Sequence, residues 1–147
     1  MASIVTVNLK QEKDFRFAIN FAEGMPVLYA DEAPPLGNAT GPNPAQLLAA
    51  AVGNCMSDSL LFAIRKFKQH PEPIQTTVAA TIERNAENRM RVQDINVKLT
   101  LGVAGSSLAH LNRALEQFEE FCTVGQSVRQ GIPVTTEVYD SEGLRLK

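Results

Sequence analysis

The run NPAQLLAAAVGNCMSDSLLFAIRK constrains the fold of this chain more than any other feature. Asn43 is a favoured N-cap residue, Pro44 suits the first helical position, and Gln46 can return a hydrogen bond to the cap. The pattern predicts a helix from Pro44 to about Lys68, ended by the QHPEP run at 69–73. Its first half is small or apolar on every side, and such a helix is buried all round. Sheets wrapped around it, a second subunit, or both are therefore needed to cover it.

Alternating apolar and polar residues on both sides of this helix predict strands. The expected strands are 4–10, 15–21, 26–30, 74–84, 91–103 and 132–139. The segment 31–43 holds three prolines and two glycines, which predicts a loop. Strands segregated around helices in this order indicate an α+β fold with antiparallel sheets. A chain of 147 residues is expected to form a single domain, 1–147.

Two further helices are expected after the fifth strand. The first, at 108–121, is amphipathic, and Ser106 or Ser107 can cap it. Its apolar stripe is Leu108, Leu111, Leu115, Phe118 and Phe121. A short helix follows at 123–130 and is closed by Gly131.

Composition and charge exclude several classes of function. The net charge is −2 and no basic stripe is present, so neither a nucleic-acid groove nor a membrane surface is indicated. The longest uninterrupted apolar run, Leu47 to Val52, is too short for a membrane span. The N-terminal run MASIVTVNLKQEKDF lacks the apolar core of a secretory signal. We therefore expect a cytoplasmic protein, in which a structural disulfide would be unusual.

The four possible soft metal ligands are Cys55, Cys122, His70 and His110. None of them pairs at the short spacings of zinc sites, so no metal site is predicted. His70 lies in a helix-ending turn and His110 in the first turn of the amphipathic helix, where both are expected to be solvated or locally bonded.

The two cysteines are open to two interpretations. A free cysteine is among the most buried residue types, so both can be inert core residues. The surroundings also suit reactive thiols, because polar residues at 57–59 enter the apolar helix one turn after Cys55. Cys122 lies between two expected helices, and the N-terminus of the short helix would favour a thiolate there. Cys55 in a buried, polar-lined niche and Cys122 near a flexible segment would suit an attacking and a resolving thiol.

Two runs carry a family resemblance. GPNPAQLLAAAVGNC resembles the helix start and first-cysteine motif of the osmotically inducible protein C and organic hydroperoxide resistance (OsmC/Ohr) superfamily. CTVGQSVRQGIPVTTEV resembles the second-cysteine motif of the same superfamily. The cysteine separation of 67 residues (122 − 55) lies in the family's range, and the order of strands and helices fits essentially the whole chain.

The resemblance implies an OsmC-like α+β fold and an intertwined homodimer, with antiparallel sheets around long central helices. It also implies a thiol-dependent peroxidase for organic hydroperoxides, active in oxidative-stress defence, that uses neither a metal nor a bound cofactor. Cys55 would be oxidised to a sulfenic acid, and Cys122 would condense with it to a disulfide. An external dithiol would then reduce that disulfide. A pocket lined by Leu and Phe side chains would favour organic hydroperoxides over hydrogen peroxide.

The chain departs from the family pattern at the activating residues. Active members carry a Glu directly after the helix-opening proline, where it holds an Arg over the thiolate, whereas this chain has Ala45. The family arginine belongs to the N-terminal hairpin, where Arg16 is the only arginine and Lys10 and Lys13 are its rivals for that role.

Two functional hypotheses follow. In the first, the chain is a cysteine-based hydroperoxide reductase with Cys55, Cys122 and Arg16 as its catalytic residues. In the second, it is a catalytically weak or inactive relative that binds a small apolar or thiol-containing ligand in a pocket at the dimer interface. The absence of a glutamate at position 45 is the warrant for the second.

Overall fold

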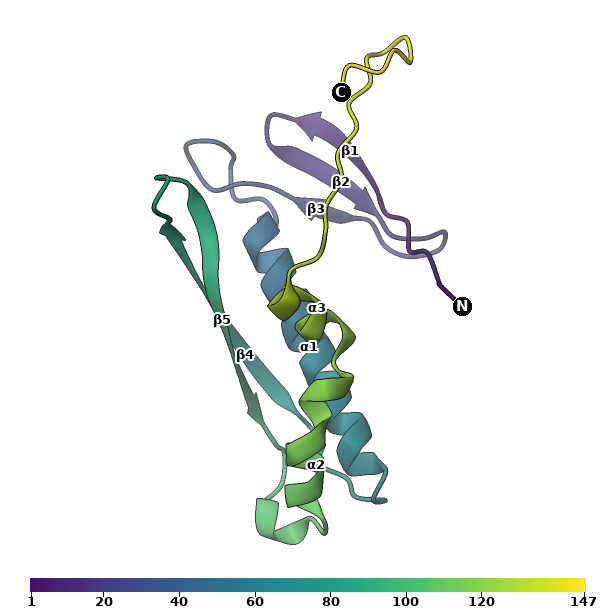
Figure 1. Cartoon of the computed structure of the whole chain (residues 1–147), viewed down its shortest axis with the longest axis vertical. Coiled ribbons are helices and arrows are strands. Elements are labelled where there is room, and N and C mark those ends of the chain that lie inside the picture. Colours follow the sequence, from purple (N-terminus) through teal and green to yellow (C-terminus); the bar gives the residue numbers. More distant parts are fainter. The chain divides into compact units, whose positions relative to one another are not determined.

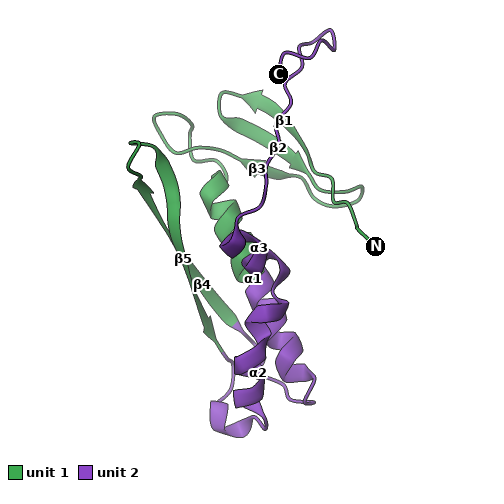
Figure 2. Cartoon of the chain, in the orientation of Figure 1, with its two compact units in different colours: residues 1–54, 75–100 green, residues 55–74, 101–147 purple.

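The computed structural model describes residues 1–147 and combines five strands, three α-helices and two short 3₁₀ segments (Figure 1). The strands are β1 (Asn8–Lys13), β2 (Arg16–Asn20), β3 (Leu28–Ala30), β4 (Gln75–Arg84) and β5 (Met90–Thr100). The helices are α1 (Pro44–Arg65), η1 (Gly105–Ser107), α2 (Leu111–Gln117), η2 (Phe118–Phe121) and α3 (Thr123–Gln130). The chain divides into two compact units, Met1–Asn54 with Gln75–Thr100 and Cys55–Ile74 with Leu101–Lys147 (Figure 2).

The first unit holds both sheets, and each is antiparallel, as predicted. In the three-stranded sheet β1 pairs with β2, so that Leu9 lies opposite Ile19, and β2 pairs with β3. The two-stranded sheet pairs β4 with β5, with Val78 opposite Val97. The α+β class and the helix–strand order up to α3 are therefore confirmed.

Helix α1 begins with the predicted capping box. The Gln46 backbone N–H donates to Asn43 Oδ1 at 2.9 Å, and the Asn43 N–H donates to Gln46 Oε1 at 2.9 Å. These two bonds satisfy two of the backbone donors that a helix start leaves without helical partners. The helix ends at Arg65, slightly before the predicted end, because the chain turns through Lys68 in a left-handed conformation (φ 56°).

Within one chain, α1 is covered along only part of its surface. The buried residues of the helix are Val52, Gly53, Met56, Leu60, Ala63 and Ile64. Ala50, Ala51 and Phe62 are exposed, so the single chain does not bury the whole apolar surface of the helix, as the sequence pattern requires. By length and composition alone α1 could cross a membrane, but the core helix of a soluble protein passes the same test.

The amphipathic helix of the second unit differs from its prediction. The expected helix at 108–121 is divided into α2 and the 3₁₀ segment η2, and its N-cap is His110 (φ 61°) rather than Ser106 or Ser107. Both serines lie in η1, where the Ser107 hydroxyl donates to the Ala104 carbonyl at 2.7 Å. Leu108, Ala114 and Phe118 are buried, whereas Leu115 and Phe121 of the predicted stripe are exposed.

The predicted last strand at 132–139 does not form in the single chain. The only β-bridge of the C-terminal segment joins Tyr139 to Arg145. A strand needs a neighbouring backbone to accept and donate its ladder hydrogen bonds, and none pairs with residues 132–137. The apolar residues of this segment are exposed, Val134 to 85%. The N-terminal strand likewise begins at Asn8 instead of residue 4.

Candidate active site

Cys55 and Cys122 both lie in the second unit, and both sulfurs contact the first turn of α3. The Val124 backbone N–H donates to Cys55 Sγ at 3.4 Å, and the Gly125 N–H donates to Cys122 Sγ at 3.3 Å. Cys122 is the N-cap of α3, as its place in the sequence suggested. The first turn of this short helix therefore binds two candidate nucleophiles with successive backbone N–H groups.

The two thiols differ in burial, and the difference is the reverse of the prediction. Cys122, expected near a flexible segment, is fully buried (0% exposed), whereas Cys55, expected in a buried niche, is half-buried. Burial is the main cause that raises the pKa of the Cys122 thiol above its ordinary value of 9.0, and a hydrogen bond with the Cys55 thiol adds to it. The Gly125 N–H and the Ser59 side chain act in the opposite direction. Cys122 is therefore a neutral thiol at neutral pH.

Gly125 permits the close approach of α3 to the buried sulfur. A Cβ atom at this position would lie 2.8 Å from Cys122 Sγ and 3.3 Å from Met56 Cε. Cβ atoms in proteins essentially never lie as close to a neighbouring atom as the 2.8 Å that separates this position from the sulfur. The glycine of the CTVGQ run is thus required by packing against the thiol.

A mainly apolar pocket lies beside the cysteine pair in the same unit. It is lined by Ser59, Phe62, Ala63, Lys66, Phe67, Ala114, Gln117 and Phe121. Ser59 links the pocket to the thiols, because its side chain hydrogen-bonds with Cys122. Lys66 Nζ lies 5.9 Å from the ring centroids of both Phe62 and Phe121, so the aromatic wall carries one cation.

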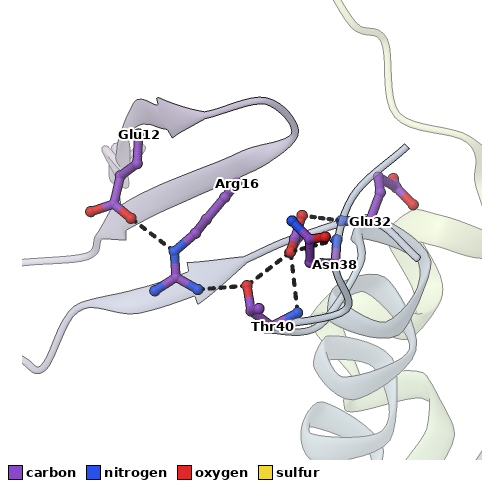
Figure 3. Close-up of polar contacts among 6 residues, drawn as sticks. Glu12, Arg16, Glu32, Asn38 and Thr40 are labelled. Carbon is purple, nitrogen blue, oxygen red and sulfur yellow. Dashed lines mark hydrogen bonds and ion pairs between the residues drawn. The ribbon is translucent and has the colours of Figure 1, made fainter. Parts of the chain in front are cut away.

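Arg16 lies on β2 in the first unit. Its Nε donates to Glu12 Oε2 at 2.8 Å, and its Nη1 donates to Thr40 Oγ1 at 2.6 Å (Figure 3). Its guanidinium also lies 4.3 Å from the Tyr29 ring centroid. The rival candidates, Lys10 and Lys13, form no ion pair. The cysteines thus share one unit and Arg16 belongs to the other, and the catalytic role of Arg16 stays a prediction.

The sequence reasoning missed Asp31, the one buried charged residue of the chain. Its carboxylate accepts hydrogen bonds from the backbone N–H groups of Glu32, Asn38 and Thr40 and from the Thr40 hydroxyl (Figure 3). The side-chain and backbone bonds from Thr40 are the main cause that lowers the pKa of Asp31. The sequence did offer one signal for this role of Asp31, namely its position directly after a strand. An Asp at such a position can accept hydrogen bonds from the backbone N–H groups of the loop that follows.

The two histidines are held by local contacts. His70 is exposed, with Nδ1 4.0 Å from Glu72 Oε2. His110 caps α2 from a left-handed conformation, and its ring centroid lies 5.0 Å from that of Phe67.

Comparison with known proteins identifies the fold. An OsmC-like protein of unknown function from Vibrio cholerae matches with TM-score 0.72 and 14% identity, over 86% of this chain and 94% of that one. An organic hydroperoxide resistance protein from Legionella pneumophila matches with TM-score 0.62 and 16% identity, over 88% and 91%. The organic hydroperoxide resistance protein OhrB of Bacillus subtilis matches with TM-score 0.59 and 17% identity, over 86% and 91%. At these identities the likeness is one of fold.

No curated protein sequence matches the chain. The family model described as OsmC-like protein matches residues 37–137, a span that contains α1, both cysteines and α3. This match covers well over half of the 147 residues, and the chain therefore belongs to the OsmC-like protein family.

Proposed function

We propose that this protein is a thiol-dependent peroxidase that reduces organic hydroperoxides in oxidative-stress defence. The observation that carries the proposal is the pairing of Cys55 and Cys122 at the first turn of α3. A half-buried thiol beside a fully buried one suits an attacking sulfur that substrate can reach and a resolving sulfur that it cannot. Family membership and the hydroperoxide-resistance proteins among the structural neighbours support a role in peroxide resistance.

In the proposed reaction the Cys55 thiolate attacks the distal oxygen of the hydroperoxide. The O–O bond breaks, the departing alkoxide takes a proton and leaves as an alcohol, and Cys55 becomes a sulfenic acid. The Cys122 sulfur then attacks Cys55, a disulfide forms, and the sulfenic oxygen leaves as water. An external dithiol reduces the disulfide by exchange and is itself oxidised. Such a cycle is suited to the reducing cytoplasm expected from the sequence.

The pocket beside the cysteines supports an organic substrate over hydrogen peroxide. Its aromatic wall of Phe62, Phe67 and Phe121 offers apolar surface that hydrogen peroxide cannot use. Ser59 both lines the pocket and hydrogen-bonds with Cys122, so a substrate seated there would have its peroxide group near the pair.

We also propose that the active form is a homodimer. Ala50, Ala51 and Phe62 leave part of the apolar surface of α1 exposed, and residues 132–137 carry apolar side chains without a paired strand. A second copy would cover both features, because apolar surface and unpaired strand backbone each favour association. Light scattering on purified protein should give twice the chain mass of 16.0 kDa, and a monomer mass would contradict this.

The enzymatic proposal is tested with purified protein, cumene hydroperoxide and a dithiol reductant. Wild-type protein should consume the peroxide, and Cys55→Ser should consume it only at the rate of the buffer control. Titration of free thiols after one equivalent of peroxide should show the loss of both thiols in the wild type. Equal consumption by wild type and Cys55→Ser would rule out the peroxidase, and two remaining thiols would rule out the disulfide step.

The alternative function is a non-enzymatic OsmC-like protein that binds a small apolar or thiol-containing ligand. The pocket walled by Phe62, Phe67 and Phe121 is the observation that favours it. Under this alternative, Phe62→Ala would weaken the binding of an apolar fluorescent probe, while wild type and Cys55→Ser would be equally inert toward peroxide.

A further inference from the structure

We propose that the Ser59 hydroxyl relays the proton of Cys122 to the alkoxide that leaves when Cys55 attacks a hydroperoxide. The inference rests on the proposed peroxidase, because the alkoxide is a product of that reaction. Ser59, both cysteines and the pocket beside them all belong to the second unit (Figure 2).

Ser59 links the buried thiol to the pocket. It follows Cys55 by four residues on α1, a spacing that places two side chains on one helix face with Cβ atoms about 5–6 Å apart. Its side chain hydrogen-bonds with Cys122 and also lines the pocket. Cys122 is 0% exposed, so the hydroxyl joins a sulfur that solvent does not reach to the space in which a substrate would lie.

The pocket offers no other acid at its cysteine end. Gln117 carries an amide, which keeps its protons at neutral pH. Lys66 lies on the pocket wall eleven residues after Cys55, which is about 16 Å along the helix axis. Neither histidine lines the pocket. An alkoxide formed at Cys55 therefore has the Ser59 hydroxyl as the proton donor that the pocket provides.

A serine hydroxyl is suited to pass a proton on, because it has one proton to donate and two lone pairs that accept. Ser59 can take the proton of Cys122 while it gives its own to the alkoxide. An alkoxide is a far stronger base than a thiolate, so the transfer is favourable even from a buried thiol whose pKa is raised. The Gly125 N–H, 3.3 Å from Cys122 Sγ, remains to stabilise the thiolate that results.

The relay couples the two steps of the proposed reaction. The Cys55 thiolate bonds to the distal oxygen, and the electron pair of the broken O–O bond stays on the alkoxide. The alkoxide takes the Ser59 proton and Ser59 takes the Cys122 proton, which gives an alcohol, the Cys55 sulfenic acid and the Cys122 thiolate. The thiolate is the nucleophilic form of cysteine and attacks the sulfenic sulfur, and the hydroxide that leaves is protonated by solvent.

The test compares two oxidants whose leaving groups differ in their need for a proton. Cumene hydroperoxide releases an alkoxide, whereas peroxybenzoic acid releases benzoate, which is stable without a proton at neutral pH. The rate constant of Cys55 oxidation by cumene hydroperoxide should fall about 100-fold in Ser59→Ala and stay within about threefold of wild type in Ser59→Thr. With peroxybenzoic acid, Ser59→Ala and wild type should agree within about twofold.

The matched control is Ser127→Ala, which removes a half-buried hydroxyl of α3 that does not line the pocket. It should stay within about twofold of wild type with both oxidants. An equal loss with both oxidants in Ser59→Ala would give Ser59 a structural role and overturn the relay alone. A wild-type protein that reacts with neither oxidant would overturn the proposed peroxidase and the relay together.

A second measurement follows the Cys122 thiol without peroxide. In a Cys55→Ala background, the ultraviolet absorbance of the thiolate gives the pKa of Cys122. Because the Ser59 hydrogen bond lowers that pKa, adding Ser59→Ala should raise it, and Ser59→Thr should keep it near the value of the background. An unchanged pKa in Ser59→Ala would show that the hydroxyl does not reach the sulfur, and would overturn the relay even in an active peroxidase.

Discussion

The backbone N–H of Val124 lies 3.4 Å from the sulfur of Cys55, and the next N–H along the chain, that of Gly125, lies 3.3 Å from the sulfur of Cys122. One helix start thus provides a hydrogen-bond donor to each thiol of the pair. What separates the two thiols is burial, which is complete for Cys122 and partial for Cys55.

The first prediction concerns the order of alkylation. At neutral pH, iodoacetamide should modify Cys55 well before Cys122, because Cys122 is buried and its pKa is raised by that burial and by the Cys55 thiol. Mass spectrometry of peptides from a timed reaction of the reduced protein measures both rates. Faster labelling of Cys122 would contradict the assignment of Cys55 as the accessible thiol.

The second prediction concerns Gly125→Ala. The new methyl group must displace Cys122 Sγ or Met56 Cε, which it would meet at 2.8 and 3.3 Å. Overpacking typically costs about 1–3 kcal/mol, and the better helix propensity of alanine returns about 1 kcal/mol. We therefore expect a net loss of about 1 kcal/mol in the free energy of unfolding, measured in urea.

Disulfide formation after one equivalent of peroxide should also be slower in Gly125→Ala, because the displaced Cys122 sulfur no longer fits beside Cys55. The matched control is Gly105→Ala, whose new methyl group would meet only the flexible end of Leu111, at 3.2 Å. Equal disulfide rates in the two variants would contradict the role of Gly125 in seating the thiol.

Local features of the sequence predicted the parts of the structure that depend on neighbours in the chain. The capping box needs only Asn43 and Gln46, three residues apart, and both of its bonds form. The place of Cys122 before a short helix was predictable for the same reason, because capping is decided within one turn. The alternation that predicts the antiparallel pairs is likewise a local property.

Features that depend on distant partners were not predictable. The bond between Thr40 and Asp31 joins residues nine apart across a loop, and that between Arg16 and Thr40 joins residues 24 apart. The segment 132–137 shows the opposite error, because its alternation predicted a strand for which the single chain offers no partner. Alternation indicates that a segment can pair, whereas pairing itself depends on what lies alongside.

The third prediction concerns the start of α1. Asn43→Ala removes the acceptor for the Gln46 N–H and should lower the free energy of unfolding by about 1 kcal/mol. Asn43→Asp keeps an acceptor oxygen and should stay close to wild type. Urea unfolding followed by circular dichroism measures both variants, and equal stability of Asn43→Ala and wild type would show that the capping box contributes nothing.

The fourth prediction is the acid dependence of stability that comes from Asp31. Hydrogen bonds from the Thr40 hydroxyl and backbone lower the pKa of Asp31 below its ordinary value of 3.8, and partial desolvation opposes them. A carboxyl whose folded pKa is depressed stabilises the fold at pH values above its unfolded pKa. The unfolded chain therefore takes up the proton first as the pH falls, and this contribution is lost between 3.8 and the lower folded value.

The measurement is the free energy of unfolding of wild type and Asp31→Asn, taken from pH 7 to pH 3. The advantage of wild type over Asp31→Asn should be constant near neutrality and shrink below about pH 4. Thr40→Val removes the largest cause of the shift, so its acid dependence should be weaker than that of wild type. Glu72 also has a lowered pKa, and Glu72→Gln should reduce the acid slope without changing the effect of the Asp31→Asn substitution. A wild-type advantage that persists unchanged at pH 3 would mean that Asp31 stabilises the loop by hydrogen-bond geometry alone, with its charge playing no part.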